Sequence, residues 1–141
     1  MTKLINVLLV DDSLSFVKAA RELVAALPCV GSVACANSGA EALALLGQTH
    51  FDLVLTDIAM PDMSGFGMIR ALRDLDHPPR VVAVTLHEAP EYRAAVLRNG
   101  AEALITKRRF ADVAPGVIAA IALECVSGFS AMAMECMSGT C

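Results

Sequence analysis

The sequence lacks the features that mark membrane, disulfide-rich and zinc-binding proteins. Although 56% of its 141 residues are hydrophobic, no uninterrupted apolar run reaches the roughly 18 to 20 residues that a spanning helix needs. Its five cysteines are odd in number and form no CxxC pair, so neither a disulfide framework nor a zinc site is indicated. No small-residue cleavage site follows the first strand-like run, which argues against a secretory signal. We therefore expect a cytoplasmic protein with no membrane partner.

An excess of positive charge is also missing. The formal net charge is −4, and residues 110–141 contain no Lys, Arg or His. Nucleic acid binding draws heavily on basic side chains that neutralise phosphates, and no helix-turn-helix pattern is recognisable. We expect this chain alone to bind no nucleic acid, and its length fits a single domain.

What is present is an alternation of apolar, β-branched runs with helix-like segments. Strands are predicted over residues 5–10, 33–36, 51–56, 81–84 and 103–105. The helices between them carry ordinary signals, such as a capping box from Ser38 to Glu41 and a glycine at position 100 after the fourth helix. Strict alternation with two-sided apolar strands predicts a doubly wound α/β fold: a five-stranded parallel sheet with helices on both faces.

Polar residues follow four of these five apolar runs. Asp11 and Asp12 follow the first run, Asp57 the third, Thr85 the fourth and Lys107 the fifth. The carboxyl ends of parallel strands meet at one edge of the sheet, so these side chains should be neighbours. Converging carboxylates repel one another unless a hard divalent cation is bound, and Mg²⁺ is the natural candidate. A lysine and a hydroxyl beside it suit a transferring phosphoryl group, with an aspartate as nucleophile.

The sequence resembles the response-regulator receiver family over about residues 4–125. Four motifs carry the resemblance: Val10-Asp11-Asp12-Ser13, Leu55-Thr56-Asp57-Ile58-Ala59-Met60-Pro61-Asp62-Met63-Ser64-Gly65, Val84-Thr85, and Gly100-Ala101-Glu102-Ala103-Leu104-Ile105-Thr106-Lys107. The resemblance implies a flavodoxin-like strand order of 2-1-3-4-5, which chemotaxis receivers share.

The resemblance also implies a role for each matched residue. Asp57 would accept a phosphoryl group from a sensor histidine kinase or a histidine phosphotransfer protein. Asp12, Asp57 and the carbonyl of Ala59 would contact Mg²⁺, with Asp11 reaching it through water. Lys107 would pair with phosphoryl oxygens, and Thr85 would move toward them as the switch. Pro61 and Gly65 would shape the loop after Asp57.

Two positions depart from the family pattern, and two others are candidates for tuning. Arg108 stands where receivers usually place a proline after the lysine, so the usual bend is not guaranteed. Leu104 occupies the position of the usual aromatic switch residue, so the threonine-to-aromatic readout cannot operate in the same way. Ala59 and His87 lie near positions that tune the lifetime of the phosphoryl group in the family.

We interpret residues 1–125 as the receiver domain and residues 126–141 as an apolar tail or the start of a linker. The tail fits a helix extension, a partner-binding stretch or a poorly ordered end, and the sequence does not choose between them. The chain is then either a stand-alone receiver that contacts a downstream protein or the receiver half of a DNA-binding transcription regulator. As a receiver it is no enzyme, because it catalyses only its own phosphorylation and dephosphorylation.

Two hypotheses from other classes remain. A small phosphohydrolase with an aspartyl-phosphate intermediate also uses Asp, Mg²⁺ and Lys at a sheet edge. Such enzymes usually have a second aspartate two residues after the nucleophile, and Ala59 occupies that position here. A flavodoxin-like cofactor binder should offer small or hydroxyl residues after the first strand, and Asp11 and Asp12 argue against it.

Overall fold

The computed structural model describes residues 4–60, 63–86 and 89–127 as an alternation of strands and helices. The elements in chain order are β1 (Ile5–Val10), α1 (Leu14–Ala25), β2 (Val30–Ala36), α2 (Gly39–Gln48), β3 (Leu53–Asp57), β4 (Ala59–Met60), β5 (Met63–Ser64), α3 (Gly65–Arg73), β6 (Arg80–Thr85), α4 (Pro90–Arg98), β7 (Ala103–Thr106), a 3₁₀ turn (Lys107–Arg109) and α5 (Phe110–Ser127).

The central sheet has five strands in the order β2-β1-β3-β6-β7, and every pairing in it is parallel. Counted along this sheet alone, the order is 2-1-3-4-5, which confirms the predicted doubly wound α/β fold. The registers align the carboxyl ends of the strands: Val10 pairs with Thr56, Asp57 with Val84, and Thr85 with Thr106. Residues that end four different strands therefore meet along one edge.

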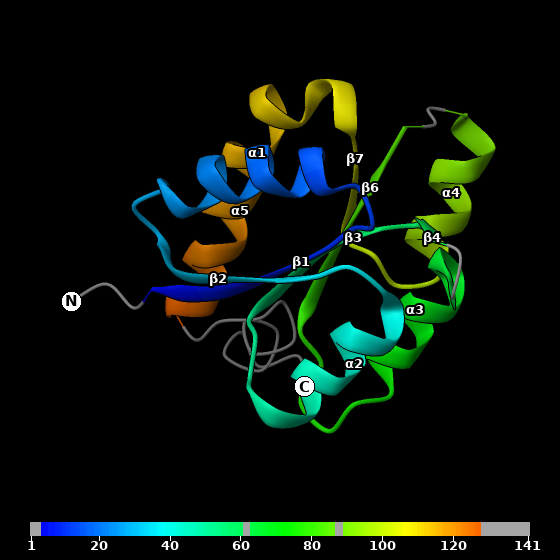
Figure 1. Ribbon diagram of the computed structural model, residues 1–141, viewed down its shortest axis with the longest axis horizontal. Helices are drawn as coiled ribbons and strands as arrows, with labels where there is room; N and C mark the ends of the chain where they lie inside the picture. Colours follow the sequence, from blue (N-terminus) through cyan, green and yellow to red (C-terminus); the bar gives the residue numbers. More distant parts are fainter. Residues whose placement is uncertain (1–3, 61–62, 87–88, 128–141) are drawn as a thin grey trace, which may run out of the picture.

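Helices cover both faces of the sheet (Figure 1), and each face buries its own hydrophobic core. On one face, alternate residues of the strands pack against α1 and α5, with Val24 and Ile118 fully buried. On the other face the intervening strand residues pack against α2, α3 and α4, with Ile69 and Val96 fully buried. The two-sided apolar strands follow from this layering, because each successive side chain enters an opposite core.

The helix boundaries follow the expected local chemistry. At the start of α2 the hydroxyl of Ser38 accepts a hydrogen bond from the backbone N–H of Glu41 at 3.1 Å, as the capping pattern predicted. Pro90 is the first residue of α4, where its missing N–H costs no helical bond. Gly100 follows α4 with a φ of 117°, a conformation that glycine adopts readily.

The element boundaries and one local hairpin differ from the expectations. Strand β2 begins at Val30 rather than at residue 33, because buried Val30 pairs with Ile5 and Ser32 pairs with Asn6, with a register shift between the two pairs. Strand β3 includes Asp57, which pairs with Val84. The antiparallel pairing of β4 with β5 was not predicted, since two-residue strands leave no periodic signal.

Some predictions concern residues outside the described part of the chain. Pro61, His87 and residues 128–141 of the predicted tail belong to this group. Helix α5 extends through residues 126 and 127, the first two of that tail. Among the described residues, no helix combines the length and the apolar character needed to cross a membrane.

Candidate functional site

Four of the five sheet strands deliver the predicted polar residues to one edge. Asp11 follows β1, Asp57 is the last residue of β3, Thr85 is the last residue of β6, and Lys107 directly follows β7. Asp11, Asp57 and Thr85 are buried, with 2%, 6% and 0% of their surface exposed. These charged and hydroxyl groups lie at the end of an otherwise apolar sheet, where burial strengthens their electrostatic interactions.

Asp11 is held in place through both of its carboxylate oxygens. Oδ1 accepts a hydrogen bond of 2.8 Å from the backbone N–H of Ser13, the residue that precedes α1. Oδ2 lies 2.7 Å from Nζ of Lys107. Burial raises the pKa of Asp11 and the charge of Asp57 adds to this rise, while the hydrogen bonds from Lys107 and Ser13 oppose it. Folding therefore makes the charged form of Asp11 less favourable than it is in water.

The two carboxylate oxygens of Asp57 have different partners. Oδ1 accepts a 3.0 Å hydrogen bond from the backbone N–H of Ala59, whereas Oδ2 lies 3.3 Å from Nζ of Lys107. The Lys107 ammonium thus bridges Asp11 and Asp57. Burial lowers the pKa of Lys107, but the hydrogen bond to Asp11 and the charges of Asp57 and Asp11 more than offset this, so the pKa lies above its ordinary value.

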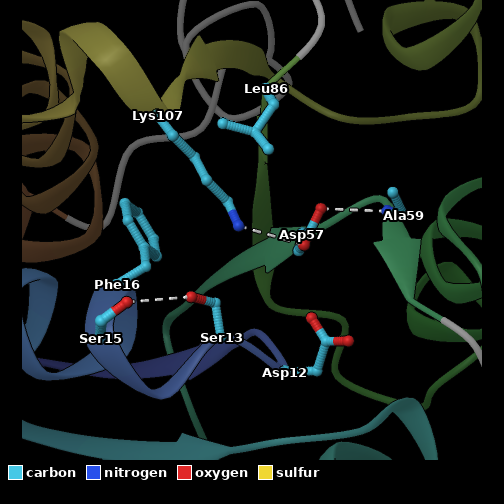
Figure 2. Close-up of a pocket in the computed structure, with 8 residues that line it drawn as sticks. All are labelled: Asp12, Ser13, Ser15, Phe16, Asp57, Ala59, Leu86 and Lys107. Carbon is cyan, nitrogen blue, oxygen red and sulfur yellow. Dashed lines mark hydrogen bonds and ion pairs between the residues drawn. The ribbon is translucent and has the colours of Figure 1, made fainter.

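An open pocket of about 530 Å³ lies over these groups (Figure 2). We call it the acidic pocket, and its lining residues are Asp12, Ser13, Ser15, Phe16, Asp57, Ala59, Leu86 and Lys107. Asp12 is exposed, in contrast to its neighbour Asp11. The pocket therefore gives solvent access to Asp12 and Asp57, while Asp11 and Thr85 do not line it.

The donor set suits a hard divalent cation. Asp11, Asp12 and Asp57 each offer a carboxylate oxygen, and these three oxygens all lie within 4.8 Å of one another. The Lys107 ammonium neutralises one of the three formal negative charges, which leaves two for a cation to balance. Oxygen-only ligands from carboxylates are those that Mg²⁺ prefers in proteins, so these residues fit Mg²⁺.

The remaining predicted residues occupy different parts of the site. Ala59 lines the acidic pocket, and its role as a carbonyl ligand stays a prediction. Leu104 is 4% exposed and belongs to the same hydrophobic core as Val96 and Ala101, so its apolar side chain is buried. His87 lies outside the described residues. The peptide bond before Arg108 is trans, as are all those described, and the chain continues from Lys107 into a 3₁₀ turn.

The sequence did not single out Phe16, Leu86 or Ser15, which also line the pocket. Phe16 is the third residue of α1, the helix that begins just after Asp11 and Asp12, and this closeness in the chain was the available signal. Leu86 directly follows Thr85 and is 73% exposed. The pocket therefore has apolar walls formed by Phe16 and Leu86 beside its carboxylates.

The arrangement suits a reaction in which an anionic group approaches a carboxylate. Asp57 offers an oxygen to the pocket, and Lys107 lies beside it as a positive charge that can neutralise developing negative charge on transferred oxygens. The aspartate is a competent nucleophile once such neutralisation is available.

Comparison with known proteins agrees with this geometry. A family model described as the response regulator receiver domain matches residues 7–113. A response regulator receiver protein of Anaeromyxobacter sp. strain Fw109-5 is 39% identical over 101 residues, which is 71% of this chain and 41% of that protein. A protein-glutamate methylesterase/protein-glutamine glutaminase of Myxococcus xanthus is 35% identical over 104 residues, 73% of this chain and 30% of that protein. The chain thus spans less than half the length of both relatives.

Solved structures show the same fold. The signal receiver domain of the response regulator NarL from Mycobacterium tuberculosis matches with a TM-score of 0.74 and 28% identity, covering 90% of this chain and 99% of that one. The chemotaxis response regulator CheY4 of Vibrio cholerae matches with a TM-score of 0.75 and 24% identity, covering 84% and 99%. At 24% identity, the similarity to CheY4 concerns the fold alone.

Proposed function

Because the chain belongs to the response regulator receiver domain family, we propose that it is a phosphorylation switch in which Asp57 is the acceptor. The observation that carries the proposal is the contact of the Lys107 ammonium with Asp57 Oδ2 at 3.3 Å, beside an open pocket. A buried carboxylate with solvent access on one side and a cation beside it can receive a phosphoryl group from a donor outside.

The transfer needs no proton from the chain. An oxygen of the Asp57 carboxylate forms a bond to phosphorus, and the bond from phosphorus to the donor nitrogen or oxygen breaks, with its electron pair staying on the donor. Lys107 stabilises the negative charge on the phosphoryl oxygens. The backbone N–H of Ala59, which already donates to Asp57 Oδ1, holds the carboxylate in its orientation.

Asp12 and Asp57, with the carbonyl of Ala59, would hold Mg²⁺, and Asp11 would reach it through water. When bound, the ion supplies positive charge that neutralises the carboxylates and the incoming phosphoryl oxygens. Among the described residues Asp11, Asp12 and Asp57 are the group whose oxygens lie close enough together to share an ion.

The natural donor would be a sensor histidine kinase or a histidine phosphotransfer protein, and the phosphorylated chain would contact a downstream protein partner. Part of the sensor histidine kinase RcsC of Escherichia coli K12 is 33% identical to this chain over 78 residues, which is 55% of this chain and 8% of that protein. We further propose a cytoplasmic location, a receiver domain over residues 1–125, and no nucleic acid binding by this chain alone.

The test is phosphorylation of the full chain by acetyl phosphate with Mg²⁺ or with EDTA. We expect one phosphoryl group per chain with Mg²⁺ and almost none with EDTA, and the label should be labile to hydroxylamine. A phosphohydrolase would instead release many equivalents of phosphate per chain from varied phosphate esters without accumulating label. That outcome, or labelling that ignores Mg²⁺, would contradict the switch.

A further inference from the structure

Phe16 contributes an aromatic wall to the acidic pocket directly beside the lysine. It is the third residue of α1 and is half-buried. Nζ of Lys107 lies 4.8 Å from the centroid of the Phe16 ring, within the distance at which an ammonium is attracted by the face of an aromatic ring. Figure 2 shows the ammonium with the ring on one side and Asp57 on the other.

A second aromatic residue packs against the Phe16 ring. Phe110 packs against it edge to face, with ring centroids 5.3 Å apart and planes at 78°. Phe110 is 4% exposed and begins α5, three residues after Lys107 and directly after the 3₁₀ turn. Phe16 therefore contacts both the Lys107 ammonium and the end of the turn that carries Lys107, and this fixes the ring relative to the lysine.

A leucine at position 16 could also pack on Phe110, but it would not attract an ammonium. Lysine has a flexible four-carbon stem, so confining its charge to one place costs conformational entropy. The carboxylates attract Lys107 from one side, and the aromatic face attracts it from the other. Unlike a carboxylate, the ring offers no oxygen that competes strongly with phosphoryl oxygens for the ammonium protons.

We propose that Phe16 is a positioning residue for phosphoryl transfer, whose ring holds the Lys107 ammonium beside Asp57. This inference rests on the proposed role of Lys107 in binding phosphoryl oxygens. With this role for Phe16, the site includes a residue of α1, and Phe110 fixes the orientation of the Phe16 ring. Arg108 follows Lys107 in this chain, so the turn has no proline at that position to restrict the backbone.

The first experiment measures the rate constant of phosphorylation by acetyl phosphate at saturating Mg²⁺. Phe16→Leu removes the ring and should lower the rate constant by about threefold to tenfold, the range that a partly desolvated cation–π contact supports. Phe16→Tyr keeps the aromatic face and should stay within about twofold of wild type. The affinity for Mg²⁺ should be unchanged in both variants, because Phe16 contributes no oxygen to the carboxylate cluster.

Phe66→Leu is the matched control. Phe66 is another half-buried phenylalanine in an aromatic pair, with Tyr92 at 5.7 Å, and it lies on the opposite face of the sheet. A comparable loss of stability with an unchanged rate constant is expected. If Phe66→Leu slows phosphorylation as much as Phe16→Leu does, or if Phe16→Tyr is as slow as Phe16→Leu, the positioning role is wrong.

The second experiment separates this inference from the proposed function. A double-mutant cycle of Phe16→Leu and Lys107→Met on the unfolding equilibrium constant measures the contact without any phosphorylation. A coupling of about twofold or more is expected, and additive effects would overturn the contact. Should the cycle show coupling while wild type accepts no phosphoryl group, the proposed function would fail and the contact would stand.

Discussion

The Lys107 ammonium lies closer to Asp11 than to the proposed acceptor: Nζ is 2.7 Å from Asp11 Oδ2 and 3.3 Å from Asp57 Oδ2. In the unphosphorylated state the lysine is thus shared between two carboxylates, and the shorter contact is with the more deeply buried one. A phosphoryl group on Asp57 would bring new oxygens within reach of the ammonium. The stability and ion binding of the site should therefore depend strongly on which carboxylates are charged.

Asp11→Asn should raise the free energy of unfolding at pH 7 in EDTA. Burial raises the pKa of Asp11 in the folded state, so folding favours the protonated form. The stability that this group contributes is present below its unfolded pKa and is lost as pH rises through the folded value. Asparagine is neutral throughout, its amide oxygen can still accept from Ser13, and Lys107 retains Asp57. Urea denaturation from pH 4 to 7 should show the advantage of the variant shrinking as pH falls.

Lys107→Met should have the opposite effect on the free energy of unfolding. It leaves three clustered carboxylates without their ammonium and should lower the free energy of unfolding by roughly 1–3 kcal/mol at pH 7 in EDTA. Added Mg²⁺ should restore part of the loss by binding the folded state. A stability decrease in Asp11→Asn as large as that in Lys107→Met would show that the Asp11–Lys107 pair, and not the buried charge, dominates.

Asp12 should matter more than Asp11 for Mg²⁺ affinity. Asp12 is exposed in the acidic pocket, whereas both oxygens of Asp11 already have partners in Ser13 and Lys107. Asp12→Ala should weaken Mg²⁺ binding by roughly tenfold or more, and Asp11→Ala by clearly less. The chain contains no tryptophan, so calorimetry suits the measurement better than fluorescence. Equal losses would contradict the division between a direct ligand and one that acts through water.

The signal should leave the site through α4 more than through β7. Leu104 is packed in the same hydrophobic core as Val96 of α4, and exposing it would forfeit about 1.5–3 kcal/mol of burial. A leucine has no hydroxyl that could offset such exposure. Amide shifts with Mg²⁺, with and without beryllofluoride as a phosphoryl mimic, should change most near Asp57, Thr85 and residues 90–99. Larger changes at residues 103–106 than in α4 would refute this route.

Gly100→Ala should destabilise the fold by about 1–3 kcal/mol, because its φ of 117° is costly for a residue with a side chain. The added Cβ would also meet the side chain of Arg73, which donates a 3.1 Å hydrogen bond to the carbonyl of Asn99. Gly47→Ala in α2 is the matched control, since a Cβ there meets nothing. It should be stabilising by about 0.5–1 kcal/mol. Thermal or urea unfolding measures both, and equal effects would show that the backbone at position 100 is unstrained.

Much of the site could be predicted because it follows from strand order alone. Asp11, Asp57, Thr85 and Lys107 each mark the end of an apolar run, and parallel pairing brings such ends together without any knowledge of side-chain packing. The contacts between these groups were not predictable. That Lys107 lies nearer to Asp11 than to Asp57 depends on the course of the 3₁₀ turn.

The parts that were missed are those without a local pattern. Phe16 and Phe110 meet only because α1 and α5 cover the same face of the sheet, and neither residue signals the other along the chain. The β4–β5 pairing involves strands of two residues, too short for alternation to appear. Arg80 joins β6 to Glu102 and to Glu124 near the end of α5, a network that depends on the tertiary arrangement of three separate segments.

Identifying the phosphorylated residue tests the proposed function most directly. Intact-protein mass spectrometry after incubation with acetyl phosphate and Mg²⁺ compares wild type with Asp57→Asn, which keeps the shape of the side chain and removes its nucleophilic carboxylate. Circular dichroism and urea unfolding check that the variant is folded. One added phosphoryl group is expected in wild type and none in folded Asp57→Asn. Persistent full labelling of that variant would show that Asp57 is not the acceptor.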